Sequence, residues 1–524
     1  MGVSMSWTSD SLGGQAPPID PSRPAVACGS EPALSWEEFR SKELSYASAL
    51  HRAGIRKGDR VAMLLKNSVD YIVFNFAIAR TGAIAVRLNW RLAPPELSFI
   101  IKDSGATLML VDDDLVEKVV GIRDEIPVRS YVVRGDDEVP DWATPIKDFL
   151  RGEVTGDFPE LGLDDPASLM YTSGTTGLPK GAIWTHGNYL WFGAMQGLQW
   201  KFDSSTVALT SGPLFHAGGW EALLMAAMVN HGTAVTYPSG NFELTEYLHA
   251  CRVHKATDIL LYSFLLVDFI RRDDCRELLP PSVRRIVTGA DSVMPWVYDE
   301  FVKKLPDVEL IQVYGSTEAG AISTSLGSEY YDRTPSVGRS MPFADVRVLG
   351  PEGEVLAPHA VGELYVRSPA CSPGYWNRPE ANAETFVDGW CRTGDLASID
   401  EDGFVTLRGR AKDMIRSAGE NIYPAEVEAV LTTAPGVADA AVIAVPDPTY
   451  AEVGCAILIA KTGETIDVES VRAFCVERMA RYKVPKHFVI ESELPRTPSG
   501  KVQKYRLRDQ YEDLGQRMEG VVHH

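Results

Sequence analysis

The chain has 524 residues, of which 45% are hydrophobic and 23% are charged, and its formal net charge is −20 at pH 7. This length predicts at least two domains, because one hydrophobic core rarely serves more than about 250–300 residues. The negative charge excludes nonspecific binding to nucleic acid, which needs a basic surface, and it is unfavourable at anionic membranes.

Two further patterns limit the class of protein. No apolar run of the sequence reaches the roughly 18 residues that cross a bilayer, so no stable membrane insertion is expected. The seven cysteines are scattered along the chain and form no Cys-x-x-Cys pair. They predict reduced thiols in a cytoplasmic protein rather than a disulfide framework or a zinc site.

The first part of the chain alternates between strand and helix patterns. Ser35 and Glu38 form a capping box that opens a helix, and Gly54 ends it. Apolar segments at 60–65 and 83–88 predict strands on either side of a helix over 71–80, which is the pattern of a parallel crossover unit. We expect further strands at five later segments: 166–172, 206–210, 233–237, 285–288 and 309–313.

After Arg410 the predicted elements become shorter. A helix begins at Pro424 and runs to about Thr433, because proline is favoured in the first helical turn. Strands are expected at 440–445 and 456–460, followed by an amphipathic helix over 468–481. The fold class predicted is α/β, with a large N-terminal domain of layered α/β sheets and a small mobile α+β lid domain at the C-terminus.

Residues 171–181 have the composition of a phosphate-binding loop. They read Tyr-Thr-Ser-Gly-Thr-Thr-Gly-Leu-Pro-Lys-Gly. Glycines let the backbone turn so that several N–H groups point at one anion, while the hydroxyls and the lysine add donors and charge. The loop is not a Walker A motif, because it ends in Pro-Lys-Gly. The residues expected to hold phosphate are Thr172, Ser173, Gly174, Thr175, Thr176, Gly177 and Lys180. A plain Gly/Ser/Thr surface loop is the alternative on composition alone.

This loop resembles the phosphate loop of the adenylate-forming superfamily, which includes acyl-CoA synthetases, peptide-synthetase adenylation domains and firefly luciferase. Five later segments resemble the family's other motifs and follow in the same order: Val-Tyr-Gly-Ser-Thr-Glu at 313–318, Trp-Cys-Arg-Thr-Gly-Asp at 390–395, Arg-Gly-Arg-Ala-Lys-Asp-Met-Ile at 408–415, Ser-Ala-Gly-Glu-Asn-Ile-Tyr-Pro at 417–424 and Pro-Arg-Thr-Pro-Ser-Gly-Lys at 495–501. The resemblance covers about residues 30 to 508 and is nearest to acyl-CoA synthetases. It implies an ATP- and acyl-binding domain over 1–409, a hinge at 410–412 and a lid domain over 413–524.

The resemblance implies two half-reactions with ATP, Mg²⁺ and CoA. A small-molecule carboxylic acid attacks the α-phosphate of ATP to give acyl-AMP and pyrophosphate, and the CoA thiol then displaces AMP. One alternative is an adenylating enzyme that passes acyl-AMP to an acyl carrier protein or a separate ligase. Another is a nucleotide-binding protein without catalysis, although the intact Glu318 and Lys501 argue against it. A homodimer stays open.

The family motifs also imply individual roles. Lys501 is the candidate catalytic cation, because charge that develops on the α-phosphate needs a positioned positive group. Glu318 would hold Mg²⁺ against the phosphates, and Thr317 would donate to the α-phosphate. Without the surrounding motifs, the alternative interpretation of Lys501 is a solvated surface lysine, and that of Glu318 is an acid at a helix N-terminus.

Three further groups of residues are expected to bind the nucleotide and the thiol. Asp395 would accept hydrogen bonds from the ribose hydroxyls, and Arg410 would reach the ribose or phosphate. Tyr314, beside Gly315, would face adenine opposite Gly289 and Ala290. Lys412 would be the pivot of the lid, because a polar and exposed hinge residue can change its backbone angles without disrupting a core. After the lid turns, the loop with Ser417, Gly419 and Glu420 would face the thiol.

The acyl pocket is expected around residues 213–220, Pro-Leu-Phe-His-Ala-Gly-Gly-Trp. The residues predicted to line it are His216, Gly219, Trp220, Tyr262, Ser316 and Gly320, with the glycines leaving volume. Relatives that activate amino acids usually have an aspartate where His216 stands, so no acidic group would bind an ammonium. We therefore expect an apolar acid of medium to large size. His216 contacts the carboxylate or gates the pocket, or else it is a core histidine. Arg87 replaces a usual proline.

Overall fold

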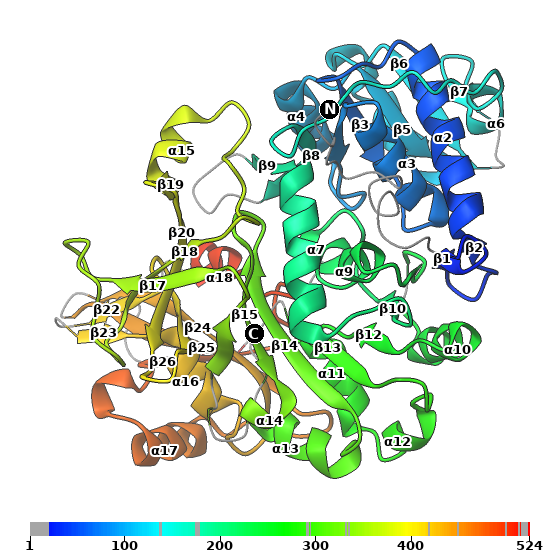
Figure 1. Cartoon of the computed structure of the whole chain (residues 1–524). Coiled ribbons are helices and arrows are strands. Elements are labelled where there is room, and N and C mark those ends of the chain that lie inside the picture. Colours follow the sequence, from blue (N-terminus) through cyan, green and yellow to red (C-terminus); the bar gives the residue numbers. More distant parts are fainter. Residues whose placement is uncertain are drawn as a thin grey trace.

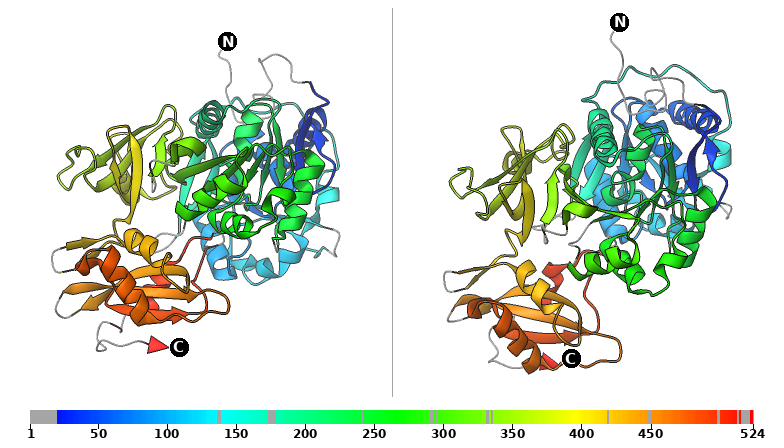
Figure 2. Two further views of the ribbon diagram at one scale, coloured as in Figure 1. Left: turned by 90° about the horizontal axis from the view of Figure 1, so that it is seen from below. Right: turned by 60° about the horizontal axis from the view of Figure 1, so that its bottom comes forward.

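The computed structural model describes residues 20–135, 139–172, 179–240, 242–289, 293, 295–330, 333, 336–417, 420–447, 450–497, 500–511, 514 and 522–523. The described chain forms a large N-terminal body and a smaller C-terminal unit, which begins after strand β21 (Phe404–Arg410) (Figures 1 and 2). This agrees with the predicted fold class. The division into 1–409, 410–412 and 413–524 stays a prediction.

A seven-stranded sheet contains the predicted crossover unit, with the strand order β7-β6-β5-β3-β4-β8-β9. Its strands are β3 (Arg60–Leu64), β4 (Ile84–Arg87), β5 (Leu108–Asp112), β6 (Ser130–Arg134), β7 (Thr144–Pro145), β8 (Pro166–Thr172) and β9 (Lys180–Thr185). Strands β3 and β4 are parallel and are joined by helix α3 (Val69–Arg80), which confirms the crossover. Strands β8 and β9 are antiparallel, so the predicted phosphate loop is the connection of a hairpin.

The predicted capping box is present at helix α2 (Trp36–Arg52). The backbone N–H of Glu38 donates to the Ser35 side chain at 3.1 Å, and the Glu38 carboxylate accepts from the Ser35 N–H at 2.7 Å. Gly54 follows the helix with φ of +88°, a conformation that glycine adopts without a steric penalty. Local sequence therefore defines both ends of this helix.

A second, larger sheet has a parallel half and an antiparallel half. The parallel half consists of β1 (Pro24–Cys28), β10 (Val207–Thr210), β11 (Thr233–Thr236), β12 (Asp258–Leu260), β13 (Arg285–Gly289) and β14 (Glu309–Ser316). The antiparallel half contains β15 (Gly320–Leu326), β16 (Ser336–Ser340), β17 (Asp345–Leu349), β18 (Gly362–Arg367), β19 (Phe386–Val387), β20 (Trp390–Ile399) and β21, and β2 (Leu34–Ser35) pairs with β1 at the other edge. The five strands predicted between residues 166 and 313 all lie in these two sheets.

Helices fill the space between the two large sheets and cover their outer faces (Figure 1). Helix α7 (His186–Trp200) lies at the centre, and α9 (Leu224–Val229) packs beside it. One core joins side chains of both sheets and of these helices, among them Met63, Phe76, Phe192 and Ile311. The other helices of the body are α4 (Pro94–Ser104), α5 (Val116–Val120), α6 (Ile146–Phe149), α8 (Ala217–Trp220), α10 (Leu244–His254), α11 (Ser263–Arg271), α12 (Cys275–Leu278), α13 (Pro295–Lys304), α14 (Gly327–Tyr330) and α15 (Pro379–Thr385).

The C-terminal unit has its own sheet and core. Its strands are β22 (Ile415–Ser417), β23 (Glu420–Ile422), β24 (Val437–Asp447), β25 (Ala451–Ala460), β26 (His487–Glu491) and β27 (Val522–His523), and its helices are α16 (Pro424–Leu431), α17 (Val468–Arg478) and α18 (Lys504–Tyr511). Helix α17 ends three residues before the predicted end, because the backbone becomes extended at Met479. Across the described part of the chain, no helix is long and apolar enough to cross a membrane.

Candidate active site

The hairpin β8–β9 holds the two described ends of the predicted phosphate loop next to each other. Thr172 and Lys180 are paired across the hairpin. The Lys180 ammonium lies over the ring of Tyr375, 5.3 Å from its centre. The other predicted phosphate-binding residues, Ser173, Gly174, Thr175, Thr176 and Gly177, lie outside the described residues. Their phosphate contacts stay a prediction.

The turn of a second hairpin, β14–β15, carries Thr317 and Glu318 and brings Glu318 next to Thr172 of the first hairpin. Its strands approach closely at Gly315, where a Cβ would overlap the carbonyl oxygen of Gly320. Ser316 accepts from the Ala319 N–H at 3.1 Å, so its side chain stabilises the turn. The Glu318 carboxylate accepts from the Thr172 hydroxyl at 3.3 Å, across a sequence separation of 146 residues. Two motifs that lie far apart in sequence therefore meet in space.

Asp395, Arg410 and Tyr314 form one cluster. Asp395 and Arg410 are paired on strands β20 and β21, and the Arg410 Nε lies 2.7 Å from the Asp395 carboxylate, which is 7% exposed. The Tyr314 hydroxyl donates to the other carboxylate oxygen. Burial first, and then the Asp395 charge, raise the pKa of Tyr314 far above its ordinary value. Binding of ribose and adenine here stays a prediction.

Gly289 ends strand β13 and packs tightly against the next strand. Its carbonyl oxygen accepts from the Ser263 hydroxyl at 3.1 Å, and a Cβ at this position would come within 2.6 Å of the Val313 carbonyl oxygen. Ala290, its predicted partner in the adenine wall, lies outside the described residues.

Residues 213–220, where the acyl pocket is predicted and which are called the acyl segment below, are held by Asn67, a residue that the sequence did not indicate. Its amide nitrogen donates to the carbonyl oxygens of Gly212 and Tyr237, each at 2.9 Å. Its amide oxygen accepts from the Leu214 N–H, also at 2.9 Å. An asparagine just after a buried strand was the only local signal, and the three partners lie about 145 to 170 residues away.

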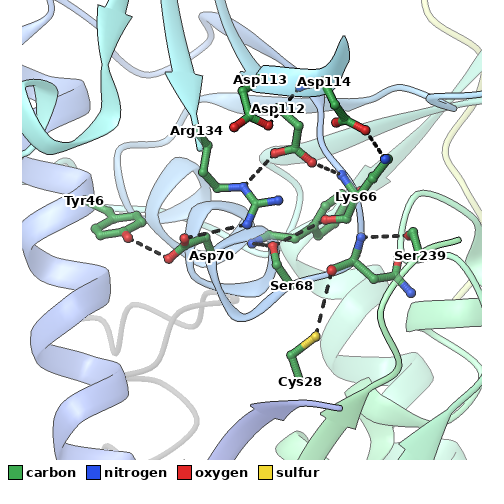
Figure 3. A network of polar contacts seen from close by, with 12 residues as sticks. Cys28, Tyr46, Lys66, Ser68, Asp70, Asp112, Asp113, Asp114, Arg134 and Ser239 are labelled. Carbon is green, nitrogen blue, oxygen red and sulfur yellow. Dashed lines mark hydrogen bonds and ion pairs between the residues drawn. The ribbon is translucent and has the colours of Figure 1, made fainter. Parts of the chain in front are cut away.

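Charged residues support the loop that carries Asn67. Figure 3 shows Arg134 between two carboxylates: its Nε lies 2.6 Å from Asp112, and Asp70 lies 3.9 Å from its Nη1. Asp112 also accepts from the Lys66 N–H at 2.7 Å. This network fixes the end of strand β3, and through Asn67 it positions the acyl segment of the other sheet.

His216 begins the short helix α8. Its Nδ1 accepts from the Gly218 N–H at 3.0 Å, so the proton of the neutral ring is on Nε2. Burial, together with the positive charges of Arg87 and Lys501, lowers the pKa of His216 to about 4. His216 is therefore a neutral donor at physiological pH. The geometry fits contact with a carboxylate, and that contact stays a prediction.

The glycines of the acyl segment do not leave the open volume that the sequence predicted. A Cβ at Gly219 would overlap the carbonyl oxygen of Pro213. Gly320 has φ of +68°, and its Cβ would lie 2.9 Å from the Phe192 ring. Trp220 is 1% exposed and contacts the ring of Phe76 edge-on in the core. These positions serve close packing, so the expectation about volume was wrong.

Tyr262 lines a cavity of about 120 Å³ beside the acyl segment, together with Asn67, Arg91, Pro213, Phe264 and other residues. The rings of Tyr262 and Phe264 are stacked, with an interplanar angle of 14°. Two aromatic faces therefore form part of the wall.

The Lys501 loop of the C-terminal unit packs against Phe264, one of the residues that line this cavity. Its turn is closed by hydrogen bonds between Thr497 and Lys501, at 2.7 Å from N–H to carbonyl and 3.1 Å from N–H to hydroxyl. Gly500 has φ of +86° and lies so close to Phe264 that a Cβ would overlap the ring. After burial and the Arg87 charge, the Lys501 charge is the third cause that lowers the pKa of His216, so Lys501 is near this ring. The lid thus presents Lys501 to the acyl segment.

The loop predicted for the thiol step lies elsewhere. Ser417 and Glu420 are the pair next to the turn of hairpin β22–β23, which Figure 1 shows at the outer edge of the lid, away from β8 and β9. Gly419 lies outside the described residues. Lys412 is exposed in the turn between β21 and β22, where a pivot would have to be. Both roles stay predictions.

A buried ion pair near His216 joins strand β4 to the end of helix α8. The Arg87 guanidinium lies 2.7 Å from the Glu221 carboxylate, and both side chains are 0% exposed. Arg87 ends strand β4, whereas Glu221 follows helix α8. The sequence marked Arg87 as a departure from the family pattern, but it did not indicate the partner.

The architecture has two large sheets and a small lid, and the predicted phosphate loop and the Glu318 motif meet in space. It defines an adenylate-forming enzyme. The chain belongs to the AMP-binding enzyme family, whose model matches residues 16–376, and the model of the family's C-terminal domain matches residues 426–501.

Curated relatives cover nearly the whole chain. The feruloyl-CoA synthase of Amycolatopsis sp is 35% identical over 483 residues, 91% of this chain and 94% of that protein. The long-chain-fatty-acid–CoA ligase FadD13 of Mycobacterium tuberculosis is 35% identical over 484 residues, 91% and 93% of the two chains. The fatty acid–[acyl-carrier-protein] ligase ScoC of Streptomyces coeruleorubidus is 34% identical over 505 residues, 94% of each.

A solved structure has the same fold. The anthranilate CoA ligase AuaEII in complex with anthranoyl-AMP superposes with a TM-score of 0.90, at 24% identity, over 98% of this chain and 99% of that one. The α/β class and the small C-terminal domain therefore agree with an experimental structure.

Proposed function

We propose that this AMP-forming acid–thiol ligase activates an apolar carboxylic acid as acyl-AMP and then transfers the acyl group to CoA. The observation that carries the proposal is the position of the Lys501 loop, which packs against Phe264 of the cavity wall and brings a positive charge near His216. This is the arrangement needed for adenylation, because the first step brings a carboxylate onto a polyanion.

In the first step each residue has an electrostatic task. Lys501 offsets the charge that develops at the α-phosphate, and Thr317 donates to the same group. Neutral His216 can donate from Nε2 to the carboxylate of the acid without adding charge. ATP would lie between hairpins β8–β9 and β14–β15, with its ribose near Asp395 and Arg410.

Glu318 is the residue that fits Mg²⁺. Among the described residues, no group of three or more His, Cys, Asp or Glu side chains could hold a metal. A single carboxylate beside a phosphate loop suits Mg²⁺, which keeps several waters and is bound by one or two carboxylates plus substrate phosphates. When bound, Mg²⁺ would neutralise phosphate charge.

In the second step the lid would turn about Lys412. The Lys501 loop would leave the acyl segment, and hairpin β22–β23 would replace it so that the Ser417–Glu420 turn faces the thiol. Hinge residues between packed units commonly absorb such rotations.

The substrate proposal depends on the pocket wall. Tyr262 and Phe264 offer aromatic surface, and His216 stands where an acidic group would be needed to bind an ammonium. Burial of apolar surface contributes about 25 cal/mol per Å². An aromatic or aliphatic acid is therefore favoured, and the substrates in the names of the relatives, ferulate and long-chain fatty acids, are of these kinds.

A carrier protein is the second candidate acceptor, and the similarity to ScoC supports it. In that case acyl-AMP would pass to a carrier-protein thiol instead of CoA. We also propose a cytoplasmic location, on the reduced cysteines, and leave a homodimer as an alternative to a monomer.

Pyrophosphate release with and without CoA tests the proposal. Ferulate, benzoate, decanoate and glycine serve as the panel of acids, and thioester is measured in parallel. We expect pyrophosphate with the apolar acids, thioester only with CoA, and neither with glycine. Thioester with a carrier protein and not with CoA would support the second candidate. Efficient turnover of glycine would refute the pocket assignment.

A further inference from the structure

Tyr375 contacts both halves of the nucleotide site. It lies between strand β18 and helix α15 and is 8% exposed. Its hydroxyl donates to Oε1 of Glu318 at 2.9 Å. Its ring lies beneath the Lys180 ammonium at 5.3 Å and against the edge of Phe386 at 5.5 Å. One side chain thus links the candidate metal ligand to the far end of the phosphate loop.

The backbone around Tyr375 is fixed to both hairpins. Tyr375 forms an antiparallel bridge with Ala182 of strand β9, and the Trp376 N–H donates to the Gly181 carbonyl at 2.8 Å. The Ser372 N–H donates to the backbone carbonyl of Glu318, also at 2.8 Å. The position of the hydroxyl is therefore set before any nucleotide binds.

We propose that Tyr375 is a positioning residue for the Glu318 carboxylate. Its hydroxyl and that of Thr172 both donate to Oε1. Oε2 has no hydrogen bond to the described part of the chain, so this oxygen is available to a cation. Two donors on one oxygen fix the orientation of the carboxylate plane. Without them, the long and half-exposed Glu318 side chain would rotate among several rotamers.

This proposal rests on the assignment of Glu318 as the Mg²⁺ ligand. Residues that orient a metal ligand typically affect metal affinity by about 10–100-fold when they are mutated. Tyr375 would act in this way, since it touches Glu318 and not the metal. A role only in packing would instead be carried by its ring, which Phe386 and Lys180 contact.

The test variant is Tyr375→Phe, which keeps the ring and removes the hydroxyl. We expect binding of Mn²⁺ in the presence of ATP, followed by electron paramagnetic resonance, to weaken about 10-fold. Tyr131→Phe is the matched control, because the buried Tyr131 hydroxyl has no hydrogen bond within the described chain. Unchanged Mn²⁺ affinity in Tyr375→Phe would overturn the proposal.

A double-mutant cycle with Glu318→Gln separates the two assignments. If Tyr375 acts through Glu318, the Tyr375→Phe change should have little further effect in the Glu318→Gln background. An equal loss in both backgrounds would overturn the positioning role. If Glu318→Gln itself leaves Mn²⁺ affinity unchanged, the metal assignment fails instead. Melting temperatures are measured alongside, and titrations are made at temperatures where each variant is folded.

Discussion

Removing one member of the Arg87–Glu221 ion pair should destabilise the N-terminal body strongly, whereas removing both should not. The two charges are 2.7 Å apart, and neither side chain has exposed surface. The proposed variants are Arg87→Met, Glu221→Met and the double variant, because methionine adapts its shape to fill the vacated space.

The size of the effect follows from the burial. A buried charge that loses its partner costs about 3–5 kcal/mol, while replacement of a whole buried pair by apolar groups is often neutral or stabilising by about 1–4 kcal/mol. The unfolding entropy near 60 °C is about 2.1 cal/mol/K per residue, or roughly 0.8 kcal/mol/K for a body of about 400 residues. Each single variant should therefore melt about 4–6 °C below the wild type.

Differential scanning calorimetry at one scan rate measures these shifts. We expect a double variant within about 2 °C of the wild type, so that the coupling between the two substitutions exceeds about 3 kcal/mol. Additive losses, with the double variant the least stable of the three, would refute this account of the pair. So would an unchanged melting temperature in either single variant.

Three further predictions address catalysis, pH and packing. Lys501→Ala should slow adenylation about 10²–10³-fold, while thioester formation from synthetic acyl-AMP is largely spared; equal losses in both half-reactions would refute the role. The folded pKa of His216, about 4, is below its ordinary value, so its contribution to stability is complete above pH 6.5 and is lost as the pH falls toward 4. In thermal melts across this range, wild type should therefore lose more stability than His216→Gln, by at most about 3 kcal/mol, and parallel curves would contradict the shift. Gly219→Ala should lower the melting temperature, whereas the control Gly121→Ala should not, because nothing lies within 4 Å of a Cβ there. A Gly219→Ala variant that is stable but prefers different acids would instead favour the interpretation of Gly219 as open pocket volume.

Local chemistry in the sequence was enough to predict some of the elements, among them helix α2 and strands β3 and β4. The capping box at Ser35 and Glu38 depends only on neighbours three residues apart, and the structure has it. The strand–helix–strand pattern before Leu88 likewise predicts a parallel pair, because parallel strands need a crossover connection that is usually a helix. The family motifs supplied the class of reaction, since each is a short run that can be identified without knowledge of its distant partners.

Contacts between distant segments were outside the reach of the sequence. Nothing near Asn67 indicates that it holds Gly212 and Leu214, and nothing near Arg87 indicates Glu221. The glycine at 219 was interpreted as open volume, yet it is there because the Pro213 backbone approaches it.

By itself, the sequence determined the α/β class, the small lid and the residue types of an adenylating site, because periodicity, capping and motif chemistry are local properties. Only the tertiary structure decided which donors reach the Glu318 carboxylate, which charges lie near His216 and which side chains line the cavity at Tyr262. These depend on how two sheets and a lid pack together, and packing is set by the shapes of side chains that are hundreds of residues apart.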